Sequence, residues 1–132
     1  MAPNPFDALA GHRYVRLSTV RKNGEAVPTP VWFARVGENL YVVTGGNTGK
    51  AKRIRNNPGV ALAPSDFRGR PKGHDLRAVA RLTEERKGGA ADRALRSKYG
   101  WQYRAFELVE RLLGSADQLV FLELSPPEER GD

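Results

Sequence analysis

Short strand-like segments, each bounded by turn residues, limit the folds that this chain can adopt. Residues 14–20 are rich in β-branched and aromatic side chains, a composition that favours a β-strand. The Asn23-Gly24 pair that follows is a strong signal for a tight hairpin turn. We predict further strands over 25–36, 40–44, 60–65, 75–83 and 118–124. Six closely spaced antiparallel strands of this length favour a small barrel over a parallel sheet.

Helical segments are expected to flank this barrel, which gives a mainly β fold with flanking helices. A short helix is expected over 4–11, and a second over 51–57 is stopped by Pro58. Between 90 and 113, apolar side chains recur at steps of three and four residues, the period of an amphipathic helix. Gly100 is expected to break or kink it. The 132 residues fit one domain, 1–132, with a disordered tail over 126–132.

The composition excludes several classes of site and favours an anionic partner. The chain has no cysteine, which excludes disulfides, thiolate zinc sites, iron–sulfur clusters and cysteine nucleophiles. Its two histidines, His12 and His74, are too few for a typical His-based metal site. The formal net charge of +7 implies an anionic ligand or surface. Without an apolar run of roughly 18–20 residues or the features of a signal peptide, a cytoplasmic protein with no membrane contact is expected.

Two prolines mark an unusual stretch of the second predicted strand. Pro28 and Pro30 have no backbone N–H to donate to a sheet. This stretch should therefore lie at a sheet edge, at a bulge, or where the backbone faces a ligand.

The segment from Val43 to Pro58 carries the clearest chemical signal. It predicts a strand, a turn with three glycines between Gly45 and Gly49, and the start of a helix. The first N–H groups of a helix point outward without partners, which makes an anion site at the positive end of the helix dipole. Thr48 can cap this helix, while Lys50, Lys52 and Arg53 bring positive charge. The spacing does not match a Walker loop, and the βαβ unit of a Rossmann site is missing.

Several motifs, in their order along the chain, resemble the flavin-binding split β-barrel superfamily, which includes pyridoxamine phosphate oxidases. The motifs are Val20-Arg21-Lys22-Asn23-Gly24, Val27-Pro28-Thr29-Pro30-Val31-Trp32-Phe33, Thr48-Gly49-Lys50, Arg55-Asn56-Asn57-Pro58 and Lys98-Tyr99-Gly100-Trp101. Together they look most like the branch that uses the deazaflavin coenzyme F420, and the resemblance covers about residues 12–125. In the superfamily an Arg-Lys pair holds the flavin phosphate. Here the pair is Gly49-Lys50, so the arginine is missing.

The resemblance implies a six-stranded split barrel that forms a homodimer, with two cofactor sites at the subunit interface. It implies that the backbone over 30–33 lines the ring system and that Lys50 and its neighbours hold the phosphate. Basic residues, among them Arg68 and Lys72, would attract the oligoglutamate tail of F420. The implied cofactor-binding residues are Pro30, Val31, Trp32, Phe33, Thr44, Asn47, Thr48, Gly49, Lys50, Lys52, Arg55, Pro64 and Arg70.

The function implied by the resemblance is an F420H2-dependent reductase of small unsaturated or conjugated substrates. The carboxylates are scattered along the sequence, so no catalytic residue is assigned. One alternative is a flavin mononucleotide (FMN) oxidoreductase of the pyridoxamine phosphate oxidase type, and another is a non-catalytic F420-binding protein. A more remote alternative is a nucleic-acid-binding barrel, which the basic composition would suit. Tyr99, Trp101, Tyr103 and Phe106 are interpreted as helix packing or dimer contacts. Trp32 is interpreted equally as core or as a wall beside the ring.

Overall fold

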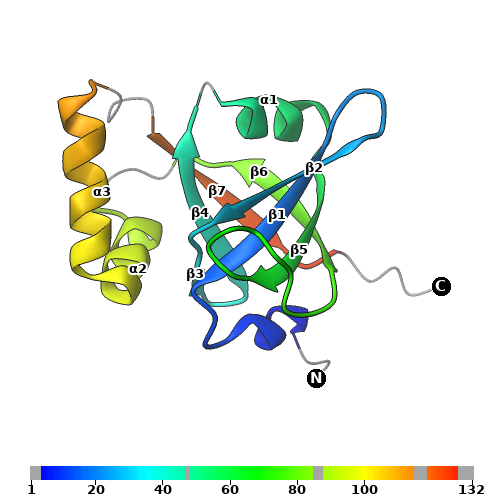
Figure 1. Cartoon of the computed structure of the whole chain (residues 1–132), viewed down its shortest axis with the longest axis horizontal. Helices are drawn as coiled ribbons and strands as arrows, with labels where there is room; N and C mark the ends of the chain where they lie inside the picture. The colour runs from blue at the N-terminus through cyan, green and yellow to red at the C-terminus, as the bar shows by residue number, and fades with distance from the viewer. Residues whose placement is uncertain (1–3, 47, 85–87, 115–118, 128–132) are drawn as a thin grey trace.

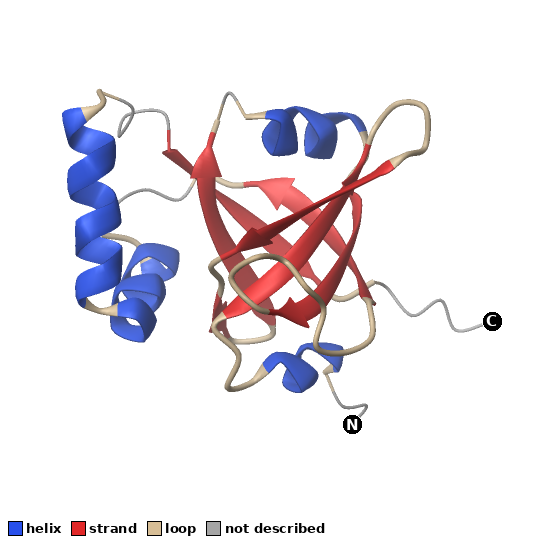
Figure 2. Ribbon diagram, viewed as in Figure 1, coloured by secondary structure: helices blue, strands red, loops and turns tan. Residues whose placement is uncertain are grey.

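The computed structural model describes residues 4–46, 48–84, 88–114 and 119–127. In this part of the chain an antiparallel sheet curves into a barrel, with helices at its ends and along one side (Figures 1 and 2). The strands are β1 (Tyr14–Val20), β2 (Ala26–Val31), β3 (Ala34–Val36), β4 (Asn39–Gly45), β5 (Gly59–Ser65), β6 (Leu76–Leu82) and β7 (Leu119–Ser125). The helices are the 3-10 helix η1 (Pro5–Leu9) and the α-helices α1 (Gly49–Asn56), α2 (Ala90–Tyr99) and α3 (Trp101–Leu112). No helix among the described residues combines the length and the apolar character that crossing a membrane requires.

The order of the strands leaves the barrel open between β2 and β3. The strands lie in the order β2-β1-β5-β6-β7-β4-β3, and each neighbouring pair is antiparallel. β2 and β3 therefore form opposite edges of the sheet although they are consecutive in the chain. Pro28 and Pro30 lie in β2, at one of these edges, as their missing N–H groups predict. This topology confirms the mainly β split barrel with flanking helices.

The sheet has seven strands rather than the predicted six, because the segment 25–36 forms two strands. β2 ends at Val31 and β3 begins at Ala34, so the chain passes from one edge of the sheet to the other between them. The first predicted helix also differs, since residues 4–11 form the 3-10 helix Pro5–Leu9. Of the predicted tail over 126–132, residues 128–132 lie outside the described part of the chain.

The end of α2 holds the break between β2 and β3. The Tyr99 hydroxyl accepts a hydrogen bond from the Phe33 amide at 3.0 Å and lies 2.7 Å from the carbonyl oxygen of Arg13. The Lys98 ammonium donates to the Phe33 carbonyl at 2.9 Å and lies 3.3 Å from the centre of the Phe33 ring. Side chains of α2 thus satisfy both backbone groups of Phe33, which a continuous strand would pair within the sheet. The two strands are separate because this helix competes for the backbone between them.

Apolar side chains pack on both faces of the curved sheet. Inside the barrel, Phe6 and Leu9 of η1 fill one end and Ile54 of α1 fills the other, in agreement with the positions of these helices in Figure 1. A second cluster lies between the sheet and α2, with Leu95 and Phe121 among its buried members. Successive side chains of a strand point to opposite faces of the sheet, so the same strands contribute to both clusters. These two clusters fix α1 and α2 on the barrel.

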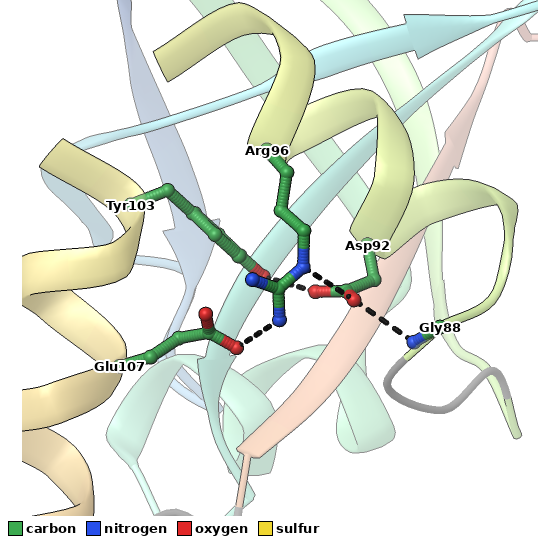
Figure 3. Close-up of polar contacts among 5 residues, drawn as sticks. All are labelled: Gly88, Asp92, Arg96, Tyr103 and Glu107. Carbon is green, nitrogen blue, oxygen red and sulfur yellow. Dashed lines mark hydrogen bonds and ion pairs between the residues drawn. The ribbon is translucent and has the colours of Figure 1, made fainter. Parts of the chain in front are cut away.

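A buried polar network joins α2 to α3 (Figure 3). Asp92 is 2% exposed and accepts hydrogen bonds from the Gly88 amide at 2.8 Å, Arg96 Nε at 2.9 Å and the Tyr103 hydroxyl at 2.9 Å. Arg96 also pairs with Glu107 of α3. Burial alone would raise the pKa of Asp92, but the donated hydrogen bonds outweigh it and lower this pKa below its ordinary value. The network sets the position of α3 relative to the barrel.

Gly100 separates the two helices that the network joins. It is the C-cap of α2 and the N-cap of α3, with φ +58°, a conformation that glycine adopts readily. The predicted break of the long helix at this residue is therefore confirmed.

Asp92→Asn is expected to destabilise the protein at pH 7 by about 2–3 kcal/mol. This is less than the roughly 3–5 kcal/mol typical of a broken buried ion pair, because Arg96 is 31% exposed. Folding lowers the pKa of this carboxyl group, so the group stabilises the protein at pH values above the pKa that it has in the unfolded chain, about 4. This contribution disappears as the pH falls below that value. Urea unfolding at pH 7 and at steps from pH 5 to 3 measures both effects. Asp75→Asn, at an exposed carboxylate, is the control. An Asp92→Asn protein as stable as this control at pH 7 would contradict the analysis.

A second prediction concerns pH dependence at the strand break. Burial lowers the pKa of Lys98 to about 8, and the charge of Arg13 adds to the shift. Between about pH 8 and the ordinary value of 10.5 Lys98 is protonated more in the unfolded chain than in the folded one, so the contribution of Lys98 to the free energy of unfolding rises with pH. Lys98→Met removes this titration and is expected to lose that rise. Urea unfolding of both proteins at pH 8 and pH 10 measures the difference, and an equal rise in both would refute the role of Lys98.

Candidate functional site

A pocket of about 570 Å³ lies beside the opening of the barrel. The end of β2, the end of β4, the first turn of α1 and one face of α3 supply most of its walls. These elements meet on the side of the barrel that faces α3 in Figure 1. The lining residues are Tyr14, Pro30, Val31, Trp32, Val43, Thr44, Gly45, Thr48, Lys50, Phe106, Glu110 and Leu119.

Thr44, Thr48 and Lys50 form a polar corner of this pocket. Thr48 is the N-cap of α1, and its hydroxyl accepts a hydrogen bond from the Ala51 amide at 3.3 Å and donates to the Gly45 carbonyl at 2.8 Å. The Thr44 hydroxyl lies 3.4 Å from that of Thr48. These contacts confirm the predicted capping role of Thr48. They also place two hydroxyl groups beside the start of a helix, where unpartnered N–H groups favour an anion.

Lys50 supplies the positive charge of the polar corner. Its side chain is half-buried, and burial lowers its pKa, with a smaller contribution from the nearby charge of Arg53. A desolvated ammonium beside a second cation is stabilised when an anion binds, because the anion offsets both effects. The polar corner is therefore suited to a phosphate or a carboxylate.

Trp32 and Phe106 form an aromatic wall of the pocket. The Trp32 ring stacks on Tyr99 with centroids 4.8 Å apart and an interplanar angle of 17°, and Phe106 meets it edge-on at 5.7 Å. Trp32 thus packs against the helical layer and also lines the pocket, while its place beside a cofactor ring stays a prediction. The bonds from Lys98 and Tyr99 to Phe33, the next residue, fix the backbone that carries it.

The structure brings together six of the residues expected to bind the cofactor and places the others elsewhere. Those that line the pocket are Pro30, Val31, Trp32, Thr44, Thr48 and Lys50. Phe33 is buried and turned toward Lys98. Gly49 and Lys52 line a separate depression. Asn47 lies outside the described residues. The binding roles of all these residues remain predictions.

Three further candidates, Arg55, Pro64 and Arg70, do not line the pocket. Arg55 is exposed in the last turn of α1, and Pro64 is buried in β5. Arg70 is exposed and forms an ion pair with Asp66 at 2.7 Å within its own loop. That loop reaches the pocket wall at one point, since a Cβ on Gly69 would lie 3.3 Å from Pro30 Cδ.

Half of the lining residues were not predicted from the sequence. These are Tyr14, Val43, Gly45, Phe106, Glu110 and Leu119. Phe106 belongs to the helical repeat of apolar residues, which predicts packing but does not distinguish a pocket wall from a core contact. No sequence pattern points to Glu110, whose carboxylate lies one turn beyond Phe106 on α3. Phe106 and Glu110 line the site because of the way in which α3 docks on the barrel.

Three of the solved structures that the chain resembles are of proteins named for different ligands, which are F420, FMN and heme. An F420 reductase is 22% identical over 96% of this chain and 97% of its own, with a TM-score of 0.59. An FMN binding protein related to pyridoxamine 5'-phosphate oxidase, from Nostoc punctiforme, is 16% identical over 91% and 73%, with a TM-score of 0.56. The heme storage protein HutZ from Vibrio cholerae is 16% identical over 93% and 87%, with a TM-score of 0.62. At these identities the likeness shows a shared fold.

The family is shown by the sequence itself. No curated protein matches the chain. The family model described as Pyridoxamine 5'-phosphate oxidase matches residues 4–128, which include the whole of the segment over which the motifs resemble the split-barrel superfamily. The chain therefore belongs to the pyridoxamine 5'-phosphate oxidase family.

Proposed function

We propose that this protein is an F420H2-dependent reductase of small unsaturated or conjugated substrates. The observation that carries the proposal is the pocket at the barrel opening, where the polar corner and the aromatic wall lie in one cavity. A ligand with a flat ring system and an anionic side chain needs both features. The resemblance of the motifs to the F420 branch supports the choice of deazaflavin.

The residues present fit such a cofactor. Lys50, Thr44 and Thr48 would hold its phosphate at the start of α1. The backbone of Pro30 and Val31, next to the Trp32 ring, would lie along the ring system. When bound, reduced F420 supplies the hydride, while the protein contributes orientation, electrostatics and exclusion of water.

The missing arginine is a departure from the pattern of the FMN-binding members of the superfamily. Gly49 stands where the superfamily has an arginine that helps to hold the flavin phosphate. An FMN-dependent oxidoreductase of the pyridoxamine phosphate oxidase type remains the alternative, and the FMN-binding structure of the same fold supports it. A non-catalytic F420-binding protein would use the same pocket, and turnover with reduced F420 distinguishes it from an enzyme.

Haem is a third ligand to test, because a heme storage protein shares the fold. Haem iron is usually held by His, Cys, Met or Tyr. The chain has no cysteine, and of the described residues that line the pocket only Tyr14 is of a ligating type. The pocket chemistry thus favours a flavin-type ligand over haem.

A homodimer is part of the same proposal, together with a cytoplasmic location. One face of α3 exposes large apolar side chains: Trp101 at 76%, Leu108 at 54%, Val109 at 51%, Leu112 at 76% and Leu113 at 73%. An exposed apolar patch of this kind marks an interaction surface. Phe106 and Glu110 of the same helix line the pocket, so a second copy packed on α3 would lie next to the cofactor site.

Lys50→Ala is expected to weaken F420 binding by at least about tenfold, because a charge-assisted hydrogen bond is worth about 1.5 kcal/mol or more. Quenching of tryptophan fluorescence during titration with oxidised F420, and separately with FMN and hemin, measures the affinities. Arg93→Ala, which removes an exposed cation of α2, is the control. Preference of the wild-type protein for FMN or hemin would contradict the choice of cofactor. Binding of none of the three would contradict the proposed site, and an oligonucleotide titration would then test the nucleic-acid alternative.

Leu112→Glu is expected to separate the dimer, because it places a charge in an apolar interface. Sedimentation equilibrium should give the mass of two chains for the wild-type protein and of one chain for the variant. Arg93→Glu, at an exposed polar position of α2, should remain dimeric. A monomeric wild-type protein at tens of micromolar would contradict the proposed dimer.

A further inference from the structure

A shallow basic depression of about 430 Å³ lies beside the first turn of α1, separate from the pocket. It is lined by Arg21, Lys22 and Asn23 of the β1–β2 turn and by Gly49, Lys52 and Arg53 of α1. Every charged residue among these is a cation. The pocket contains Thr48 and Lys50, whereas the depression contains Gly49. The two hollows therefore adjoin at the start of the same helix.

Arg53 is the cation of this depression that the fold positions most firmly. Its Nε donates a hydrogen bond to the Thr19 hydroxyl at 2.6 Å, and Thr19 is fully buried in β1. This bond limits the freedom of a side chain that would otherwise move in solvent. The guanidinium group, which offers several donors in a fixed plane, suits a phosphoryl or carboxylate group.

Gly49 leaves the space that the Arg53 guanidinium occupies. A Cβ added at Gly49 would lie 2.6 Å from Arg53 Nη1 and 3.5 Å from Arg53 Cζ. The φ of Gly49 is not in the left-handed region, so the backbone does not require glycine here. Glycine also lowers helix stability relative to alanine. The contact with Arg53 is therefore the physical reason for glycine at this position.

Arg53 and Lys50 also interact electrostatically. The charge of Arg53 contributes to the lowered pKa of Lys50, so the two cations repel each other across the first turn of α1. The positive end of the helix dipole adds to this repulsion. An anion at the start of α1 would be attracted to Lys50, to Arg53 and to the positive end of the helix dipole. It would also relieve the repulsion between the two side chains.

We propose that Gly49 and Arg53 act as one unit, in which the glycine admits the guanidinium group and Arg53 serves as the second cation, beside Lys50, for the phosphoryl group of the ligand. This inference rests on the proposed function, because it concerns the same anion site. It assigns to Arg53 a binding role and to Gly49 a positioning role that acts through Arg53. The cation missing at position 49 is thus supplied from one turn further along α1.

Gly49→Ala tests the unit without removing any charge. The added Cβ meets the far end of a flexible side chain, so it displaces the Arg53 guanidinium while the fold is kept. We expect Gly49→Ala and Arg53→Ala each to weaken F420 binding by roughly tenfold. Arg93→Ala, which removes an exposed cation of α2, is the charge-matched control and should change the affinity by less than about twofold. Urea unfolding should show that Gly49→Ala still unfolds in one cooperative transition, so that weaker binding does not come from loss of the fold.

The double variant gives the sharpest comparison. If Gly49 acts through Arg53, adding Gly49→Ala to Arg53→Ala should cause no further loss of affinity. An equal loss in both backgrounds would overturn the inference, because Gly49 would then matter independently of Arg53. If Lys50→Ala weakens binding while Gly49→Ala and Arg53→Ala behave like Arg93→Ala, the inference fails and the proposed function stands. If the wild-type protein binds neither F420 nor FMN, both fail.

Discussion

The bonds from Lys98 and Tyr99 to the backbone of Phe33 are the interaction on which the architecture of the site depends. They stop the strand that contains Pro28 and Pro30 and send the chain to the opposite edge of the sheet. The same bonds fix the backbone next to Trp32, so the feature that splits the barrel also builds the aromatic wall of the pocket.

The rest of the site is assembled by elements that are themselves held by buried contacts. The Asp92 network ties α3 to α2, and α3 in turn brings Phe106 and Glu110 to the pocket. At the other side, packing of Ile54 inside the barrel holds α1 so that its first turn faces the cavity. The arrangement separates a flat apolar surface from a cationic corner. That separation, more than the overall positive charge, is the basis for proposing a ligand with a ring system and an anionic group.

Local signals predicted much of this fold, and contacts between distant residues account for what they missed. The Asn23-Gly24 turn, the Thr48 cap and the break at Gly100 are decided by neighbouring residues, and each occurs where the sequence indicates it. The split of 25–36 into two strands depends on Tyr99, 66 residues away from Phe33. Local propensity therefore predicts one strand over 25–36 instead of two.

The site shows the same division between local and distant information. The polar corner lies within one short segment around α1: Thr48 and Lys50 follow from the local signals of a helix start, and Thr44 follows from the family resemblance. Glu110 enters the pocket only because two helices dock on the barrel. The contact between Gly49 and Arg53 depends on side-chain geometry, which sequence spacing does not give. The most direct test of the central claim is a series of ¹H–¹⁵N correlation spectra of the protein as oxidised F420 is added. The account predicts the largest shifts at the Trp32 indole and at the amides of Thr48 to Lys50. Shifts that avoid both groups at saturating F420 would contradict it.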